Sequence, residues 1–417
     1  MKNSDMFIHD EKLYVNQSVL TDRLLSFFIY SSVVLPTGSL FGINVKILSL
    51  LVFIVGLLIK RKSVVITSTI IKITPLTLFL LIWIALSITV MNYDIEYLPS
   101  QAKDVFVFFL MFYICSGYAQ KCCGYEYLMK KITTAIFLVG IMKVMILIFS
   151  FVTGMPVSVI IRQIGALFGT AIMTFDVESS SISRINFTSD SIIFICLFYM
   201  FMKLFREGYT KKDYMVLAVI CFSALVSMSR FQWATCVLSV MIALFLNLKK
   251  KKAFIVICMI TVSSIGTLSL PSVQEMIKTR FDQRVVDASD SERDFQKIAI
   301  YAKIDASPII GNGVGYYIPT MIRSYIAKYS YELQIQALVM QFGWLGTTFI
   351  MLMILVPLAS TRKGMSVATF LMYMAICFVW LSGALFNPIL FSSSAGAGMA
   401  ALYAIGNASW IKMKKQR

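Results

Sequence analysis

The sequence predicts an all-α fold, a polytopic bundle of about twelve helices that are each long enough to cross a membrane. The 417-residue chain is 58% hydrophobic and only 14% charged, and its mean hydropathy of +0.79 is far above the range of soluble domains. Apolar runs of about 18 or more residues recur along its length. Alternating patterns of about ten residues, typical of an outer-membrane barrel, are missing, so α-helices are the expected spanning structure.

The apolar runs place the spanning helices in order along the chain. We expect them at residues 24–42, 43–59, 74–91, 104–119, 132–153, 189–204, 213–229, 231–248, 253–270, 333–358, 366–386 and 391–410. Two long intervals remain on the outer side, at residues 154–188 and 271–332. The whole chain, residues 1–417, is therefore expected to be a single integral membrane domain with one large extramembrane loop at 271–332.

Basic residues gather in the links on one side of this arrangement. The net charge is +17, and Lys and Arg cluster at residues 60–62, 121–131, 206–212, 249–252, 362–363 and 412–417. The positive-inside rule makes this side cytoplasmic, so we expect both termini in the cytoplasm and the large loop on the outer side. Because anchoring at the membrane explains most of the excess charge, nucleic-acid binding is not expected.

The large loop has helical periodicity on either side of the stretch SPIIGNGVGYY. The stronger pattern consists of Ile318, Met321, Ile322, Tyr325, Ile326 and Tyr329, and a weaker stripe consists of Phe295, Ile298, Ala299 and Ala302. These patterns predict two short amphipathic helices that lie on the bundle or at the lipid interface. Gly311, Gly313 and Gly315 form the turn between them, either as a plain connector or by presenting backbone N–H groups to an oxygen-rich ligand.

Arginines on the outer side are the candidate anion-binding residues. Arg230 interrupts the apolar stretch LVSMSRFQWAT, where a charge costs roughly 2.5–3.5 kcal/mol on insertion scales. It faces either an anion-binding cavity or the lipid interface, where its long stem reaches water or an ion pair. Arg280, Arg284 and Arg293 stand among acidic residues of the loop, so they form either a mixed-charge surface or a phosphate site suited to the planar guanidinium group.

Metal-ligating residues are scarce. His9 is the only histidine, and the closest carboxylate pairs are Asp94 with Glu96 and Asp287 with Asp290. Most of the eight cysteines lie in apolar runs, which implies no disulfide framework. The sequence therefore predicts neither a metal site nor a cofactor.

The order of these features resembles the superfamily of O-antigen ligases and O-antigen polymerases. The matching stretches are Ser229-Arg230 at a helix boundary, the arginines from Arg280 to Arg293, the segment PIIGNGVG at 308–315, and ELQIQALVMQFGWLG at 332–346. The last stretch ends in the Gly-x-x-Gly of the family, but Glu332 stands where ligase-like members have histidine. This departure favours the polymerase subgroup. The resemblance implies a GT-C-like, multi-pass protein of the bacterial inner membrane with its large loop in the periplasm.

The resemblance also implies a reaction. A growing glycan on undecaprenyl pyrophosphate would be transferred to a sugar hydroxyl of a lipid-linked repeat unit by a metal-independent glycosyltransferase. Arg230, with Arg280 or Arg284, would stabilise the leaving pyrophosphate, and Arg293 would bind phosphate or hold the loop. Gly311, Gly313 and Gly315 would approach the substrate, and Glu332 would be the general base, with Asp94 and Glu96 as the alternative pair.

Three alternatives remain beside this interpretation. One is an O-antigen ligase that transfers the same glycan to lipid A core, and another is a lipid-linked oligosaccharide flippase or other transporter. The third is a purely structural scaffold in polysaccharide assembly, which predicts that the loop arginines can be neutralised without loss of polymer. A transporter usually carries repeat symmetry and ionisable residues near the midplane, and Lys143 is the clearest charge inside an apolar run. The polar residues concentrate instead in one outer loop, which favours an enzyme. Expected partners are lipid-linked oligosaccharides, membrane lipid, a chain-length regulator and a flippase.

Overall fold

The computed structural model confirms an all-α bundle. It describes residues 4–36, 38–89, 95–170, 174–175, 184–248, 253, 269, 271, 274, 277–278, 281–408 and 411, with the backbone alone at 4–18, 95, 174–175, 284–286 and 288–289. Within these residues the only sheet is a two-stranded antiparallel ribbon of β1 (Thr174–Phe175) and β2 (Arg184–Ile185). Six of the described helices are long and apolar enough to cross a membrane.

The helices follow the expected apolar runs. Their bounds are α1 (Ser4–Val34), α2 (Val45–Ile59), α3 (Ser63–Thr89), α4 (Leu98–Tyr118), α5 (Tyr125–Thr153), α6 (Val157–Leu167), α7 (Ile193–Arg206), α8 (Lys211–Val226), α9 (Arg230–Phe245), α12 (Gln283–Ala306), α13 (Gln334–Ser360), α14 (Val367–Ser382) and α15 (Ser393–Asn407). Short single turns are η1 (Ile95–Tyr97), η2 (Ala119–Cys123), η3 (Thr188–Ile192) and η4 (Gly383–Leu385). Every expected segment overlaps a helix except 253–270, which lies outside the described residues apart from 253 and 269.

Polar residues in the short links set where the helices begin. The side chain of Asn44 accepts hydrogen bonds from the first amides of α2, and Ser229 and Ser392 cap α9 and α15 in the same way. Thr210 and Asp213 form a reciprocal capping box at the start of α8. These side chains satisfy amide groups that have no partner within the helix, so they fix each helix start to within a residue.

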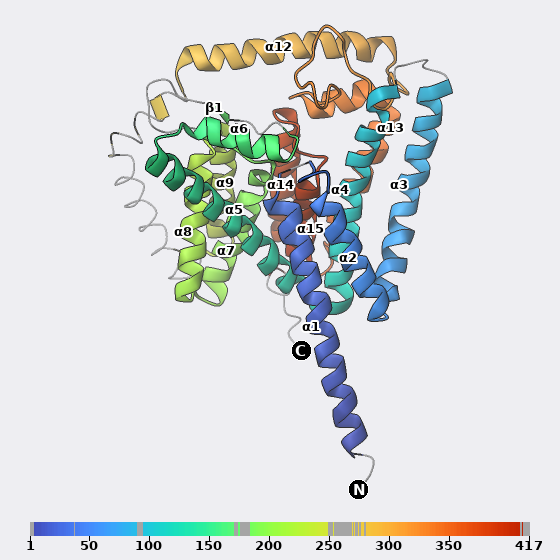
Figure 1. Cartoon of the computed structure of the whole chain (residues 1–417), viewed down its shortest axis with the longest axis vertical. Helices are drawn as coiled ribbons and strands as arrows, with labels where there is room; N and C mark the ends of the chain where they lie inside the picture. The colour runs from blue at the N-terminus through green and yellow to red at the C-terminus, as the bar shows by residue number, and fades with distance from the viewer. Residues whose placement is uncertain are drawn as a thin grey trace.

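Close backbone packing brings α15 and α4 together at the centre of the bundle. The small residues of α15 allow this approach, because a Cβ atom at Gly396 would lie 2.5 Å from the carbonyl oxygen of Phe108 in α4. Figure 1 shows α12 lying across one end of the bundle, opposite the N-terminus. The segment that follows α12 contacts α3, α4 and α13 near this end of the bundle.

The first expected loop helix is present as α12, but it buries a different face. Gln296, Ile300 and Ile304 are its buried residues, whereas Phe295 and Ile298 of the expected stripe are 65% and 70% exposed. Apolar spacing alone predicts the face that carries Phe295 and Ile298. Gln296 occupies the buried face because its side-chain oxygen accepts a hydrogen bond from the backbone N–H of Glu332.

The second expected helix, over 318–329, is wrong. Residues 307–333 form turns and irregular chain. Pro319 disfavours helical backbone at the residue before it, and the amide of Gln341 in α13 donates to the carbonyl oxygens of Tyr316 and Tyr329, 2.9 Å away in each case. Contacts with the bundle therefore replace the hydrogen bonds that a helix would make.

Candidate functional site

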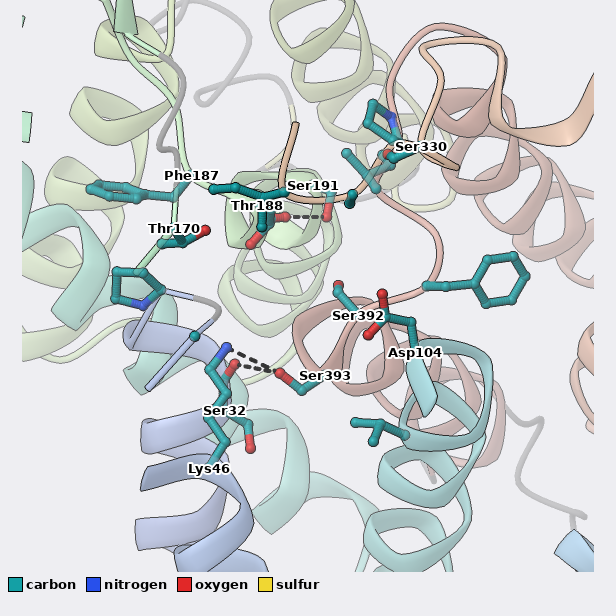
Figure 2. Close-up of a pocket in the computed structure, with 18 of the residues that line it drawn as sticks. Ser32, Lys46, Asp104, Thr170, Phe187, Thr188, Ser191, Ser330, Ser392 and Ser393 are labelled. Atoms are coloured by element: carbon teal, nitrogen blue, oxygen red, sulfur yellow. Dashed lines mark hydrogen bonds between the residues drawn. The ribbon is translucent and has the colours of Figure 1, made fainter. Parts of the chain in front are cut away.

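A cavity of about 910 Å³ lies among the helix ends nearest α12, beside the irregular segment (Figure 1). Its lining includes residues of α1, α2, α4, η3, α9 and α15 and of the segment 323–330. Figure 2 shows Lys46, Asp104, Thr188 and Ser393 on its walls. A cation, a carboxylate and several hydroxyl groups thus meet around one space of a size suited to a small-molecule ligand.

Lys46 stands on the α2 wall of this cavity. Its Nζ atom donates to Ser393 Oγ at 3.2 Å, and that hydroxyl in turn donates to the carbonyl oxygen of Ser32 at 3.1 Å. The contacts join α1, α2 and the start of α15 (Figure 2). Among the described residues, the ammonium group is therefore held by one neutral oxygen atom.

Asp104 stands on the α4 wall. Tyr329 donates its hydroxyl proton to Asp104 Oδ2, and Lys103 Nζ lies 3.9 Å from the other carboxylate oxygen. Burial, followed by the Asp104 charge, raises the pKa of Tyr329, so the phenol keeps its proton and remains a donor. The carboxylate is 37% exposed and lines the cavity, so it can accept a proton from a bound molecule.

Charged residues beside the cavity form an arginine clamp, defined here as Arg293, Arg323 and Glu332. Arg293 Nε lies 3.0 Å from Glu332 Oε2, and Arg323 Nη2 lies 2.9 Å from Oε1. The clamp ties α12 to the irregular segment just before α13, and Arg323 also lines the cavity. Arg184 is electrostatically coupled to this group, and burial lowers its pKa although Asp190 and Glu332 oppose the shift.

The structure brings together only part of the predicted arginine site. Of the four predicted arginines, Arg293 reaches Glu332, while Arg280 lies outside the described residues and Arg284 is described by its backbone in α12. Arg230 is the first residue of α9 and is partly exposed. Its neighbours Ser229 and Phe231 line the cavity, but Arg230 itself is not among the lining residues.

The glycine turn packs into a break in α13. Gly343 has φ of 66°, which interrupts the helix and leaves backbone groups without helical partners. The turn supplies them, because Asn312 and Gly313 donate to carbonyl oxygens of α13 and the amide of Trp344 donates to Pro308 at 2.8 Å. The Gly-x-x-Gly ending thus has a structural partner in the loop.

Each of the three predicted glycines has a positive φ, and the backbone N–H of each donates a hydrogen bond within the protein. Gly311 donates to Ser307, Gly313 donates to Gln341, and Gly315 donates to the side chain of Gln101. A Cβ atom at Gly315 would lie 2.5 Å from the amide nitrogen of Leu98. The close approach that these glycines permit is therefore to helices α4 and α13.

A buried ion pair lies behind the cavity wall. Lys143 Nζ is 2.7 Å from Asp190 Oδ2, with side chains 0% and 2% exposed, and it also donates to the carbonyl oxygen of Ser223. The Phe187 amide donates to the same carboxylate oxygen at 3.0 Å. Phe187 lines the cavity, so this pair anchors part of its wall.

The sequence interpretation missed Lys46, Asp104, Arg323 and Asp190 as members of the site. Lys46 carried a usable signal, because it is a cation near the boundary of an apolar run, the same property that singled out Arg230. Asp104 follows Lys103 at the start of another run, where such a pair is typical of ordinary interfacial charge.

Among the described residues, no group of three or more His, Cys, Asp or Glu could hold a metal ion. Asp94 lies outside those residues, and Glu96 is 3.8 Å from Lys328. No protein-family model matches the sequence, and no curated protein matches it.

Proposed function

We propose that the chain is a polysaccharide polymerase of the O-antigen type, a multi-pass protein of the bacterial inner membrane. In this proposal about twelve helices span the membrane, both termini are cytoplasmic and the loop at 271–332 is periplasmic. The enzyme transfers a growing glycan from undecaprenyl pyrophosphate to a lipid-linked repeat unit. It is a metal-independent glycosyltransferase in which the protein's own side chains act as the base and stabilise the leaving group.

The observation that carries the proposal is the cavity at the outer helix ends, which combines Asp104 with cationic side chains. The reaction breaks the bond between the anomeric carbon and the phosphate oxygen, and the lipid diphosphate leaves with the bonding electrons. The acceptor oxygen forms the new bond to that carbon and gives up its proton. A carboxylate accepts this proton, and cations stabilise the charge that develops on the diphosphate.

Asp104 and Glu332 have different parts in this mechanism. Both oxygens of Glu332 are engaged by arginines, so its geometry suits holding the clamp more than accepting a proton. Asp104 faces the cavity and has a single phenol donor on one oxygen. We therefore assign the general base to Asp104 and the positioning of Arg323 to Glu332.

The proposal is tested with purified full-length protein in proteoliposomes that contain a synthetic undecaprenyl-pyrophosphate-linked repeat unit. We expect a ladder of elongated lipid-linked glycans, and we expect Asp104→Asn to slow elongation by about 100-fold or more. Asp305→Asn, which neutralises an exposed carboxylate on α12, is the matched control and should elongate at the wild-type rate. Transport of the lipid without elongation, or transfer only to lipid A core, would reject the polymerase assignment.

A further inference from the structure

The end of the cavity between α2 and α15 contains a polar cluster that has no part in the proposed mechanism so far. It consists of Lys46, Ser32, the N-cap residue Ser392 and the first residue of α15, Ser393, all of which line the cavity. Three separate segments of the chain, α1, α2 and α15, contribute to it. Figure 2 shows Lys46, Ser32 and Ser393 in contact at this end.

The charge of Lys46 is not balanced within the described part of the chain. Its only polar contact there is Ser393 Oγ at 3.2 Å, and no carboxylate of the described residues pairs with it. Partly buried cations usually pair with an anion, because removal from water is unfavourable for an isolated charge. A bound anion would supply that partner.

The hydroxyl of Ser32 gives an independent indication. The residue is fully buried, and its Oγ atom has no hydrogen-bond partner among the described residues. Buried hydroxyl groups are nearly always hydrogen-bonded, so an orphan in a cavity wall points to a ligand atom. Because a hydroxyl can donate its proton, an anionic oxygen is a suitable partner.

The N-terminus of α15 adds a third feature. Ser392 caps this 15-residue helix and its Oγ accepts the amide of Ala395, so the helix start is held firmly beside Lys46. The first amides of a helix have no acceptor within it, and the helix dipole favours negative charge at this end. Phosphate groups bind at such positions in other proteins.

We propose that Lys46, Ser32, Ser393 and the N-terminus of α15 bind the diphosphate group of the lipid-linked substrate. This inference rests on the proposed function, since it assigns one end of the same cavity. The ammonium group meets the charge that grows on the diphosphate as the glycosidic bond breaks, and the sugar extends towards Asp104. Lys46 is thus a substrate-binding residue drawn from the second helix, far in sequence from the arginine-rich loop.

The test measures binding of undecaprenyl pyrophosphate and of inorganic pyrophosphate to the full-length protein in detergent micelles. We expect Lys46→Met and Ser393→Ala each to weaken lipid binding, the first at least tenfold, and Lys46→Arg to retain most of it. Lys297→Met removes an exposed lysine of α12 and is the control, with affinity within twofold of wild type. Ser393→Ala preserves the helix cap on Ser392, so it reports on the site even where Lys46→Met lowers expression.

The outcomes separate this inference from the polymerase assignment. If Lys46→Met loses lipid binding and the wild-type protein shows no elongation, the diphosphate site is supported and the polymerase assignment is rejected. Elongation at the wild-type rate with unchanged lipid affinity in both Lys46→Met and Ser393→Ala overturns the site and leaves the polymerase standing. Binding of inorganic pyrophosphate as tight as that of the lipid supports an anion site for the free ion, and binding of the lipid alone supports the lipid-linked group.

Discussion

Neutralising Glu332 distinguishes between two roles of this residue, a structural clamp and a general base. The Glu332→Gln variant removes the charge that holds Arg293 and Arg323 at 3.0 and 2.9 Å. Charge-assisted hydrogen bonds contribute about 1.5–3 kcal/mol each, and glutamine keeps one acceptor oxygen, so we expect the free energy of unfolding to fall by about 2–4 kcal/mol. The low exposure of the carboxylate, 17%, places the loss above that of a surface pair.

Asp290→Asn is the matched control for this measurement. Asp290 lies 3.1 Å from Arg293, at nearly the same distance as Glu332, but its side chain is 58% exposed. Solvent screens such a pair, so we expect a loss of only about 0.2–1 kcal/mol. Chemical unfolding of the purified variants in the same detergent gives the two free energies. Equal losses in the two variants would refute the clamp.

The experiment is completed by comparing the elongation rates of Glu332→Gln and the wild type at equal amounts of folded protein. A clamp predicts that Glu332→Gln, well below its unfolding transition, loses much less of its elongation rate than a variant that lacks the general base. A general base predicts a loss of about 100-fold or more that persists when the protein is fully folded. The second result, with unchanged stability, would return the base to Glu332 and remove it from Asp104.

Three further predictions concern the same end of the bundle and its support. Gly315→Ala should destabilise far more than Gly42→Ala, because both have φ near 80° but only Gly315 faces backbone at 2.5 Å; thermal unfolding of the two variants checks this. Lys143→Met and Asp190→Asn should each lower the free energy of unfolding by about 3–5 kcal/mol, and the double variant by less than their sum, in a double-mutant cycle. Burial raises the pKa of Tyr331 from 10.0 to about 12, so its contribution is complete below pH 10 and is lost towards pH 12, by about 1.4 kcal/mol per pH unit. Tyr331→Phe should flatten the stability-versus-pH curve in that window.

The helices were predictable because apolar length and short polar links are local properties. Runs such as 132–153 and 333–358 coincide with α5 and α13, and caps at Ser229 and Ser392 mark helix starts within the sequence. The sequence showed the Gly-x-x-Gly ending that contains Gly343, but it did not predict that the helix breaks there. The partner of this break, the glycine turn, is about thirty residues away, so the sequence indicated a need for close approach without identifying what is approached.

The charged site was less predictable because its pairs are distant in sequence. Arg293 and Glu332 are 39 residues apart, and the pairing of Tyr329 with Asp104 spans 225 residues. Local periodicity likewise predicted a helix over 318–329, where tertiary hydrogen bonds from Gln341 decide the backbone. Composition could select arginine as an anion-binding residue, but only the fold determines whether a carboxylate already occupies it.

The pairing of each cation with a carboxylate determines how much positive charge it presents to a ligand. Arg293 and Arg323 share the charge of Glu332, with Asp290 adding a second carboxylate, so the clamp contributes little net positive charge to the cavity. Electrostatic attraction between charges falls with distance and with compensation by closer opposite charges. Lys46, which has only neutral oxygen contacts among the described residues, therefore presents the larger uncompensated charge to a ligand. An anionic substrate should accordingly place its diphosphate at the α2–α15 end of the cavity, with the clamp holding the loop that closes the opposite side.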